Sequence, residues 1–172
     1  MEICLALAIE QVLAALNAEK VRYLVVGGVA VVLHGHLRTT ADLDLVVELA
    51  PDNARRAISA LVKLGFRPRA PVPAEQFADP AARRAWIDEK GLTVFSLWSE
   101  RLPEIEVDLF VKEPFHFDEV YARAVRVPLD TTTVTVVSLA DLIALKQAAG
   151  RPVDLADVDA LRALASAGGG SP

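Results

Sequence analysis

Residues 23–48 read YLVVGGVAVVLHGHLRTTADLDLVVE, and this stretch decides the fold. The apolar, β-branched run that ends at Gly27-Gly28 is typical of a strand buried on both faces. The valine-rich segment 28–34 contains no hairpin signal and lies between two strand-like runs, so we expect a short helix there. A second strand is predicted over 42–48, after a polar approach.

Asp42 and Asp44 are two positions apart on this second strand. They therefore share one face, while the leucines between and after them point to the other face. Adjacent carboxylates repel each other and gain nothing from a dry environment, so a divalent metal is the simplest occupant of this face. Asp-x-Asp also occurs by chance on solvated strand edges. The upstream glycine pair strengthens the metal interpretation, because a helix that begins there has a free N-terminus for phosphate.

The composition is that of an ordinary globular protein. Hydrophobic residues make up 53% and charged residues 24% of the 172 residues, which argues against a disordered chain. This length suits a single domain, which we expect over 1–166 with a helical portion at 138–166, followed by a disordered tail at 167–172. The net charge of −5 argues against a protein that coats nucleic acid non-specifically.

The location of the protein is predicted from its cysteine content and its apolar runs. Cys4 is the only cysteine, so no intramolecular disulfide is possible and a reducing, cytoplasmic location is expected. The apolar segment 3–16 is interrupted by Glu10 and Gln11 and has helical spacing, which favours an amphipathic helix over a signal sequence. No run is long enough to span a membrane, so we expect no membrane partner.

The remaining chain predicts further helices and strands. Pro51 is placed to begin a helix that ends before Gly65, and Ser138 is placed to cap another that ends before Gly150. The proline-rich segment 67–91 is predicted as a surface loop with a short irregular helix at 81–87. Other predicted elements are strands at 93–98 and 104–111 joined as a hairpin, a helix at 117–125, a strand at 131–137 and a last helix at 154–165. The fold class is therefore α+β, with a mixed twisted sheet flanked by helices and with C-terminal helices.

A third acidic residue follows on a later predicted strand. Glu104, Glu106 and Asp108 alternate with apolar residues there, and Asp108 has the most apolar surroundings because Leu109, Phe110 and Val111 follow it. Asp108 is the candidate partner of Asp42 and Asp44, and Glu106 on the same face is its rival.

These elements, in this order, resemble the signature of the nucleotidyltransferase superfamily, whose fold is shared by DNA polymerase beta and antibiotic nucleotidyltransferases. The signature is a Gly-Gly turn at a strand end, a helix, Asp-x-Asp on the next strand and a later acidic residue. The string Gly35-x-x-Arg38-x-Thr40-x-Asp42-Leu43-Asp44 resembles a small bacterial branch that includes toxins of toxin-antitoxin pairs. The string Leu142-x-x-x-Lys146-x-x-x-Gly150-Arg151-Pro152-x-Asp154-x-x-Asp157 resembles the same branch.

The resemblance implies a two-metal mechanism with Mg²⁺ or Mn²⁺. Asp42, Asp44 and Asp108 are then both the catalytic residues and the metal ligands: the first two bind the metal on the triphosphate, and Asp108 shares a second metal and helps to activate the acceptor hydroxyl. Gly27 and Gly28 are implied to bind nucleotide, because residues without a side chain let the backbone approach phosphate.

Arg38, Thr40 and Lys146 complete the implied nucleotide-binding set. Arg38 either contacts phosphate or only neutralises the acidic cluster. On a helical wheel Lys146 falls on an apolar stripe, so its ammonium needs an anion or a path to water. A triphosphate or the aspartate cluster is one such partner, and Asp154 or Asp157 on the last helix is the other.

Two further groups of residues have either a structural or a functional role. His34 and His36 flank Gly35 near a helix end, and we interpret them as structural rather than catalytic. Arg83 and Arg84 lie close to Trp86 and suit nucleic-acid contact, but a solvated helix face is favoured.

The predicted function is the transfer of a nucleoside monophosphate from a nucleoside triphosphate onto a hydroxyl of RNA, protein or a small molecule. The branch resemblance adds a role as a toxin, with a cognate antitoxin as partner. One alternative is a sugar-nucleotide glycosyltransferase, although that fold normally needs a longer chain before its Asp-x-Asp motif. Another is a catalytically inactive binding or regulatory module, which would have no need of Asp108.

Overall fold

The computed structural model describes residues 2–168, with side chains from Cys4 onward. Its helices are α1 (Glu2–Ala18), α2 (Gly27–Leu33), α3 (Pro51–Lys63), the 3₁₀ turn η1 (Ala74–Ala78), α4 (Pro80–Lys90), α5 (Phe117–Ala122), α6 (Leu139–Ala149) and α7 (Pro152–Gly168). Its strands are β1 (Tyr23–Val26), β2 (Asp42–Val47), β3 (Arg67–Pro68), β4 (Val94–Trp98), β5 (Glu106–Phe110), β6 (Val125–Pro128) and β7 (Thr133–Val136).

All seven strands form one mixed sheet in the order β3-β4-β5-β2-β1-β7-β6. In the centre, β1 is antiparallel to β2 and parallel to β7, and β2 is parallel to β5. All four residues of β1 are buried, as its unbroken apolar sequence requires. The predicted mixed sheet with flanking helices is thereby confirmed.

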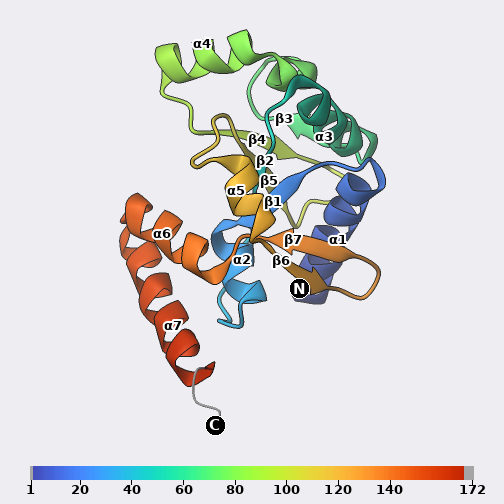
Figure 1. Cartoon of the computed structure of the whole chain (residues 1–172). Coiled ribbons are helices and arrows are strands. Elements are labelled where there is room, and N and C mark those ends of the chain that lie inside the picture. Colours follow the sequence, from blue (N-terminus) through green and yellow to red (C-terminus); the bar gives the residue numbers. More distant parts are fainter. Residues whose placement is uncertain (1, 169–172) are drawn as a thin grey trace.

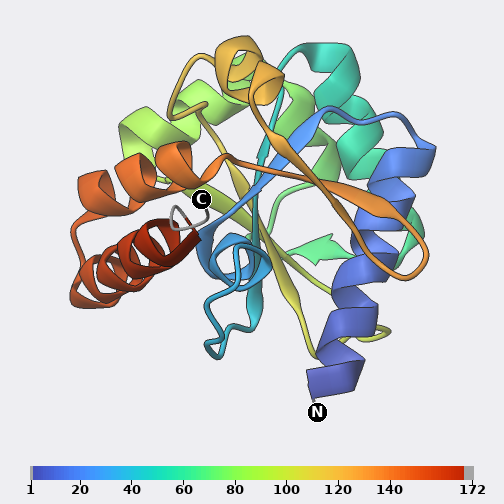
Figure 2. The same cartoon turned by 60° about the horizontal axis from the view of Figure 1, so that its bottom comes forward.

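The helices form two groups around the sheet. α1 packs against α3, α3 against η1, and η1 against α4. α6 packs against α7 and also contacts α2. In Figure 1 and Figure 2 the pair of α6 and α7 lies on the opposite side of the molecule from α1 and α3. The C-terminal helices therefore stand beside the short helix that follows the glycine pair.

Local sequence signals set most element ends where the sequence predicts them. Pro51 occupies the first turn of α3, and the Ser138 hydroxyl accepts a hydrogen bond from the Asp141 amide at the start of α6. Gly150 ends α6 with a left-handed backbone at φ +66°. The predicted hairpin is confirmed, because β4 and β5 pair antiparallel.

The prediction for segment 67–91 is wrong in one respect. α4 is a regular helix, capped by the Asp79 carboxylate and ended by Gly91, and it is not confined to the surface. Trp86 stacks on Phe95 with a centroid distance of 5.0 Å and an interplanar angle of 2°, and Phe77 is fully buried. These isolated aromatic residues show no periodicity in sequence, so their contact with β4 appears only in the folded chain.

Two other boundaries differ from the prediction. The helix expected over 117–125 ends at Ala122, and residues 125–128 form β6, which pairs with β7. α7 continues through Ala167 and Gly168, the first two residues of the expected tail, and residues 169–172 lie outside the described part. Within residues 2–168, no helix has the length and apolar character needed to cross a membrane.

Candidate active site

Four carboxylates lie on one face of the sheet because of the register between β2 and β5. Asp44 is directly opposite Asp108, and Asp42 is directly opposite Glu106. Residues that pair across neighbouring strands share a face, and the strands are only about 4.8 Å apart. The alternate residues of β2, Leu43 and Leu45, are fully buried on the other face. The sheet therefore joins two acidic pairs that are more than sixty residues apart in the chain.

The glycine pair fits closely against this face. Gly27 has φ +66°, and a Cβ atom placed on it would lie 2.0 Å from Oδ2 of Asp44. A Cβ on Gly28 would lie 2.7 Å from Oγ1 of Thr40 and 3.5 Å from Cζ of Arg38. Both glycines are thus needed to admit side chains of the protein itself. This reason is additional to the phosphate approach that the sequence suggests.

Burial makes two of the aspartates reluctant to ionise. Burial, reinforced by the negative charges of Asp108 and Asp42, raises the pKa of Asp44 to about 6. Burial also raises the pKa of Asp108, with further contributions from Asp42 and Glu106 and an opposing one from the Ser96 hydroxyl. Oδ1 of Asp108 is buried and has no hydrogen-bond partner among the described residues. A buried carboxylate oxygen without a donor calls for a cation.

These carboxylates suit a hard divalent cation, although they do not enclose one by themselves. Among residues 4–168, no three Asp, Glu, His or Cys side chains converge tightly enough to form a complete metal site. Mg²⁺ does not need such a cage, since it is usually held by one or two carboxylates and completes its shell with phosphate oxygens and water. The unpartnered oxygen of Asp108 and the carboxylate donor set therefore fit this cation.

A second charged cluster stands beside the first, where α6 and α7 meet the segment before β2. Nζ of Lys146 lies 2.9 Å from Oδ1 of Asp154 and 2.9 Å from Oδ2 of Asp157. Arg38 donates from Nη1 to Oδ2 of Asp157 at 2.6 Å, and Arg151 donates from Nε to Oδ2 of Asp154 at 2.6 Å. Lys146, Asp154 and Asp157 are all buried. Of the two partners predicted for Lys146, the structure has the aspartates of the last helix.

The two clusters interact electrostatically. The charges of Lys146 and Arg151 oppose the rise in the pKa of Asp44. Burial alone would raise the pKa of Asp154, but the hydrogen bonds from Arg151 and Lys146 outweigh it and lower the pKa to about 2. This second cluster has three cations, Arg38, Lys146 and Arg151, and two carboxylates, Asp154 and Asp157, and we call it the basic cluster. It lies on the Asp44 side of the acidic face.

The structure brings most of the predicted site residues together. Gly27 leaves no room for a Cβ beside Asp44, Gly28 leaves none beside Thr40, and the Thr40 hydroxyl donates to the main-chain oxygen of Asp42 at 3.3 Å. Arg38 reaches Asp157, so it is tied to the basic cluster. The predicted site lacks Arg151, Asp154 and Asp157, although the C-terminal string contains all three. The signal that identifies them is their spacing from Lys146, which places all four at one helix junction.

The structural role predicted for His34 is supported, whereas of the two arginines predicted to lie on a solvated helix face only Arg84 does so. Nε2 of His34 donates to the main-chain oxygen of Val137 at 2.8 Å, which supports a structural role. Arg83 is buried and donates to the main-chain oxygens of Phe77 and Leu49, so its prediction as part of a solvated helix face is wrong. Its guanidinium holds η1 and the end of β2 to α4. Arg84 is exposed, as predicted.

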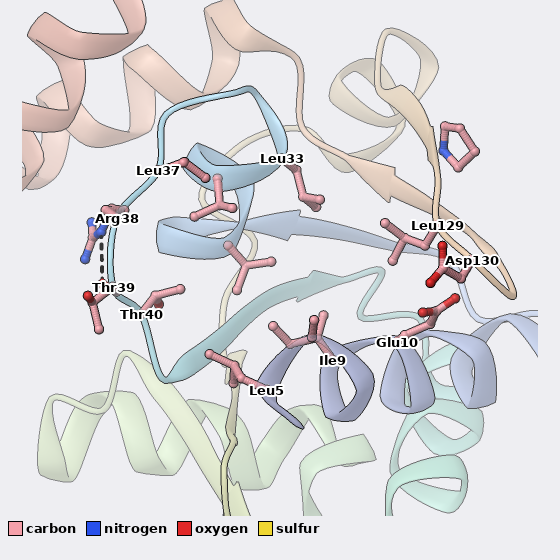
Figure 3. A pocket seen from close by; sticks show the side chains of 14 residues that line it. Leu5, Ile9, Glu10, Leu33, Leu37, Arg38, Thr39, Thr40, Leu129 and Asp130 are labelled. Atoms are coloured by element: carbon pink, nitrogen blue, oxygen red, sulfur yellow. Dashed lines mark hydrogen bonds between the residues drawn. The ribbon is translucent and has the colours of Figure 1, made fainter. Parts of the chain in front are cut away.

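Two pockets border the segment between α2 and β2. The larger, about 850 Å³, lies between α1, α2 and the β6–β7 turn, with apolar walls that include Leu5, Ile9, Leu33 and Leu129 (Figure 3). It contains none of the three aspartates, and Figure 3 shows the Arg38 guanidinium pointing away from it. The smaller, about 370 Å³, is lined by Asp42 and by residues of β4 and β5. The smaller pocket is therefore the one that adjoins the acidic face.

Solved structures of two other proteins share the fold. The chain is similar in fold to a lincosamide antibiotic adenylyltransferase, LnuA, solved with lincomycin, at 14% identity and a TM-score of 0.61 over 91% of this chain and 96% of that one. It is also similar to the antibiotic-resistance factor ANT(2'')-Ia, at 16% identity and a TM-score of 0.61 over 98% of this chain and 86% of that one.

At the level of sequence, no curated protein matches the chain. One family model does match, over residues 5–166, and it describes a nucleotidyltransferase of unknown function, DUF6036. This match covers almost the whole chain, including all three aspartates and the C-terminal helices. The chain therefore belongs to the DUF6036 family of nucleotidyltransferases.

Proposed function

We propose that this protein transfers a nucleoside monophosphate from a nucleoside triphosphate to an acceptor hydroxyl, with Asp42, Asp44 and Asp108 as metal ligands. The observation that carries the proposal is the pairing of Asp44 with Asp108 on one sheet face, with a buried Asp108 oxygen that lacks a partner. Such a group lowers the stability of the fold. Its presence is explained by a cation that binds there during catalysis.

In this proposal different residues bind the triphosphate and the acceptor. Asp42 and Asp44 would hold Mg²⁺ or Mn²⁺, which when bound neutralises charge on the triphosphate and lowers the pKa of the acceptor hydroxyl. Arg38, Lys146 and Arg151 supply positive charge on the Asp44 side, where the triphosphate would lie. Gly27, Gly28 and Thr40 would shape the backbone around the phosphates.

Asp108 would serve the acceptor. In the proposed step the acceptor oxygen forms a bond to the α-phosphorus, while the bond from that phosphorus to the bridging oxygen of the β-phosphate breaks. Pyrophosphate leaves with the electron pair, and the hydroxyl proton passes to Asp108 or to water. The unpartnered, buried Oδ1 of Asp108 leaves this carboxylate free to face the metal and the acceptor.

The proposal is tested with Asp42→Asn and Asp44→Asn. Each should remove Mg²⁺-dependent binding of nucleoside triphosphate, measured by calorimetry, because a neutral amide does not replace a carboxylate ligand. Asp52→Asn is the matched control, since Asp52 lies in the first turn of α3, is exposed and pairs with Arg55. Circular dichroism should show that all three variants are folded.

Unchanged triphosphate binding in both site variants would refute this function. It would favour the inactive binding module, which has no need of Asp108. Transfer from a nucleotide sugar without release of pyrophosphate from a triphosphate would instead favour the glycosyltransferase.

The toxin role stays a prediction of the sequence resemblance and depends on a partner chain. Growth arrest on expression of the wild-type chain, absent with Asp44→Asn, would support it. Rescue by a gene that neighbours the coding sequence would identify the antitoxin. Normal growth at high expression would contradict it.

A further inference from the structure

We infer that the pocket of about 370 Å³ beside Asp42 is the acceptor site and that it takes a small, positively charged hydroxyl compound. This inference rests on the proposed function and adds the class of acceptor to it. The pocket is lined by Ala41, Asp42, Arg69, Trp98, Ser99, Glu100, Pro103, Glu104, Ile105 and Glu106.

The position of the pocket assigns it to the acceptor. Asp42 pairs with Glu106 across β2 and β5, and Leu97 pairs with Val107 across β5 and β4, so Trp98 follows Glu106 along the same face. This row runs away from the basic cluster, which lies on the Asp44 side. If the basic cluster receives the triphosphate, the acceptor hydroxyl approaches from the Trp98 side and meets Asp108, which is on the neighbouring row of the same face, opposite Asp44.

The aromatic wall of the pocket already attracts cations. Cζ of Arg67 lies 4.8 Å and Cζ of Arg69 lies 5.5 Å from the centre of the Trp98 ring. Trp98 is partly exposed, and a tryptophan face is the strongest of the aromatic surfaces for positive charge. Two guanidinium groups of the chain already use this ring, so a ligand cation would meet the part of Trp98 that they leave exposed.

The charged side chains that line the pocket also favour a positively charged ligand. Arg69 donates to both carboxylate oxygens of Glu106, at 3.0 and 2.8 Å, and Arg67 is paired with Glu100. Within each of these two pairs the positive and negative charges cancel. The side chains of Asp42 and Glu104 form no ion pair within the described residues. With Asp42 assigned to the metal, Glu104 is left as the free charge, and it favours a cation and disfavours a polyanion such as RNA.

Size agrees with a small molecule. Pockets for small ligands have volumes of about 300–1,000 Å³, whereas a polymer needs an extended groove. Among the three acceptor classes that the sequence leaves open, RNA, protein and small molecules, the pocket therefore favours the last. A ring that bears an amine and a hydroxyl would place the amine near Glu104 and Trp98 and the hydroxyl toward Asp42 and Asp108.

The test offers the protein matched acceptors that differ in charge. Wild-type protein is incubated with Mg²⁺, the four α-labelled nucleoside triphosphates and one of three acceptors: a pool of amino sugars, the same pool after N-acetylation, or total RNA. Labelled products are separated by chromatography. We expect the amine pool to be labelled at least about tenfold faster than the acetylated pool, since the loss of one well-placed charge contact is worth roughly 1.4 kcal/mol.

Variants assign the effect to this pocket. Glu104→Gln should raise KM for the amine pool about fivefold, the value of one partly exposed ion pair, with the triphosphate Kd unchanged. Glu89→Gln removes the same charge from an exposed position on α4 and should change neither constant. Equal effects of the two variants would overturn the assignment.

The remaining outcomes separate the inference from the proposed function. Equal or faster labelling of RNA or of the acetylated pool overturns the acceptor class. So does labelling of no pool by a protein that still binds Mg²⁺ and triphosphate through Asp42 and Asp44. Loss of the aspartate dependence of triphosphate binding overturns the proposed function instead.

Discussion

At the scale of the residue, Asp44 is the clearest case of a side chain whose position lowers stability. Burial and the neighbouring carboxylates raise its pKa from 3.8 to about 6. In the unfolded chain it titrates near its ordinary value, so the folded state favours the protonated form. Its favourable contribution is complete below about pH 4 and is lost as the pH rises through about 6. At neutral pH, without metal, the ionised Asp44 therefore destabilises the fold.

This predicts that Asp44→Asn makes the metal-free protein more stable at pH 7.5. A shift of about two pKa units corresponds to a gain of about 2 kcal/mol after allowance for partial exposure. The gain should shrink as the pH falls through 6 and vanish near pH 4. Urea denaturation at several pH values measures it.

The same two proteins, the wild type and Asp44→Asn, are compared again in the presence of Mg²⁺. It should raise the midpoint of wild-type denaturation, because a ligand of the folded state stabilises it, and it should leave Asp44→Asn unaffected. Identical stability of the two proteins from pH 4 to 7.5 would show that Asp44 is not strained by its surroundings.

Gly27 is a second residue whose contribution to stability can be measured by a single substitution. Gly27→Ala puts a Cβ atom 2.0 Å from Oδ2 of Asp44 and also forces alanine to φ +66°. Gly91→Ala isolates the backbone effect, since Gly91 has φ +60° and a Cβ there would meet nothing within 4 Å. We expect Gly91→Ala to cost about 1 kcal/mol and Gly27→Ala at least about 1 kcal/mol more, by urea denaturation.

The double variant identifies the cause of that difference. Asp44→Ala removes the Oδ2 and Cγ atoms that the new Cβ would meet at 2.0 and 2.6 Å and leaves only the Cβ at 2.9 Å, so Gly27→Ala should be less harmful in that background. An equal cost of the two glycine substitutions in the wild type would contradict the close approach.

At the scale of the element, α6 and α7 are joined by charge as well as by packing. Lys146 of α6 bridges Asp154 and Asp157, which are one turn apart on α7, and Arg38 ties Asp157 to the segment before β2. A buried ion pair contributes little relative to apolar residues, but removal of one member leaves an uncompensated charge. The junction therefore fixes how the two helices stand beside the acidic face.

Lys146→Met is the corresponding prediction. It should lower the free energy of unfolding by about 3 kcal/mol, because two buried carboxylates lose a shared partner. Lys63→Met removes an exposed ion pair with Glu19 and should cost less than about 1 kcal/mol. Chemical denaturation at pH 7 compares them. Similar small costs for both would mean that Lys146 is not the partner of these aspartates in solution.

At the scale of the whole molecule, the central position of β2 organises the chemistry. One of its faces supplies Leu43 and Leu45 to the core and the other supplies Asp42 and Asp44. Its two flanking strands then place different groups on either side. The β1 side carries the glycine pair and leads to the basic cluster, and the β5 side carries Asp108 and leads to Trp98. Donor and acceptor thus have separate approaches to one metal site in the proposed reaction.

The sequence predicts this architecture well where the signals are local. Gly27 marks the turn, Ser138 and Gly150 mark the ends of α6, and the alternation in β2 identifies its two faces. The prediction is wrong where contact depends on distant partners. Trp86 and Arg83 look like surface residues of a proline-rich segment, but β4, β2 and η1 bury them. The strand β6 is missed because it is stabilised only by its pairing with β7.

The sequence by itself determined the fold class, the acidic strand and the likeness to nucleotidyltransferases, because these depend on spacing within short segments and on their order along the chain. Only the tertiary structure decided which residues face which. The register between β2 and β5 pairs Asp44 with Asp108, and the α6–α7 junction gives Lys146 to Asp154 and Asp157. The physical reason is that hydrogen-bond register and helix packing are properties of segments far apart in the chain, and no single segment encodes them.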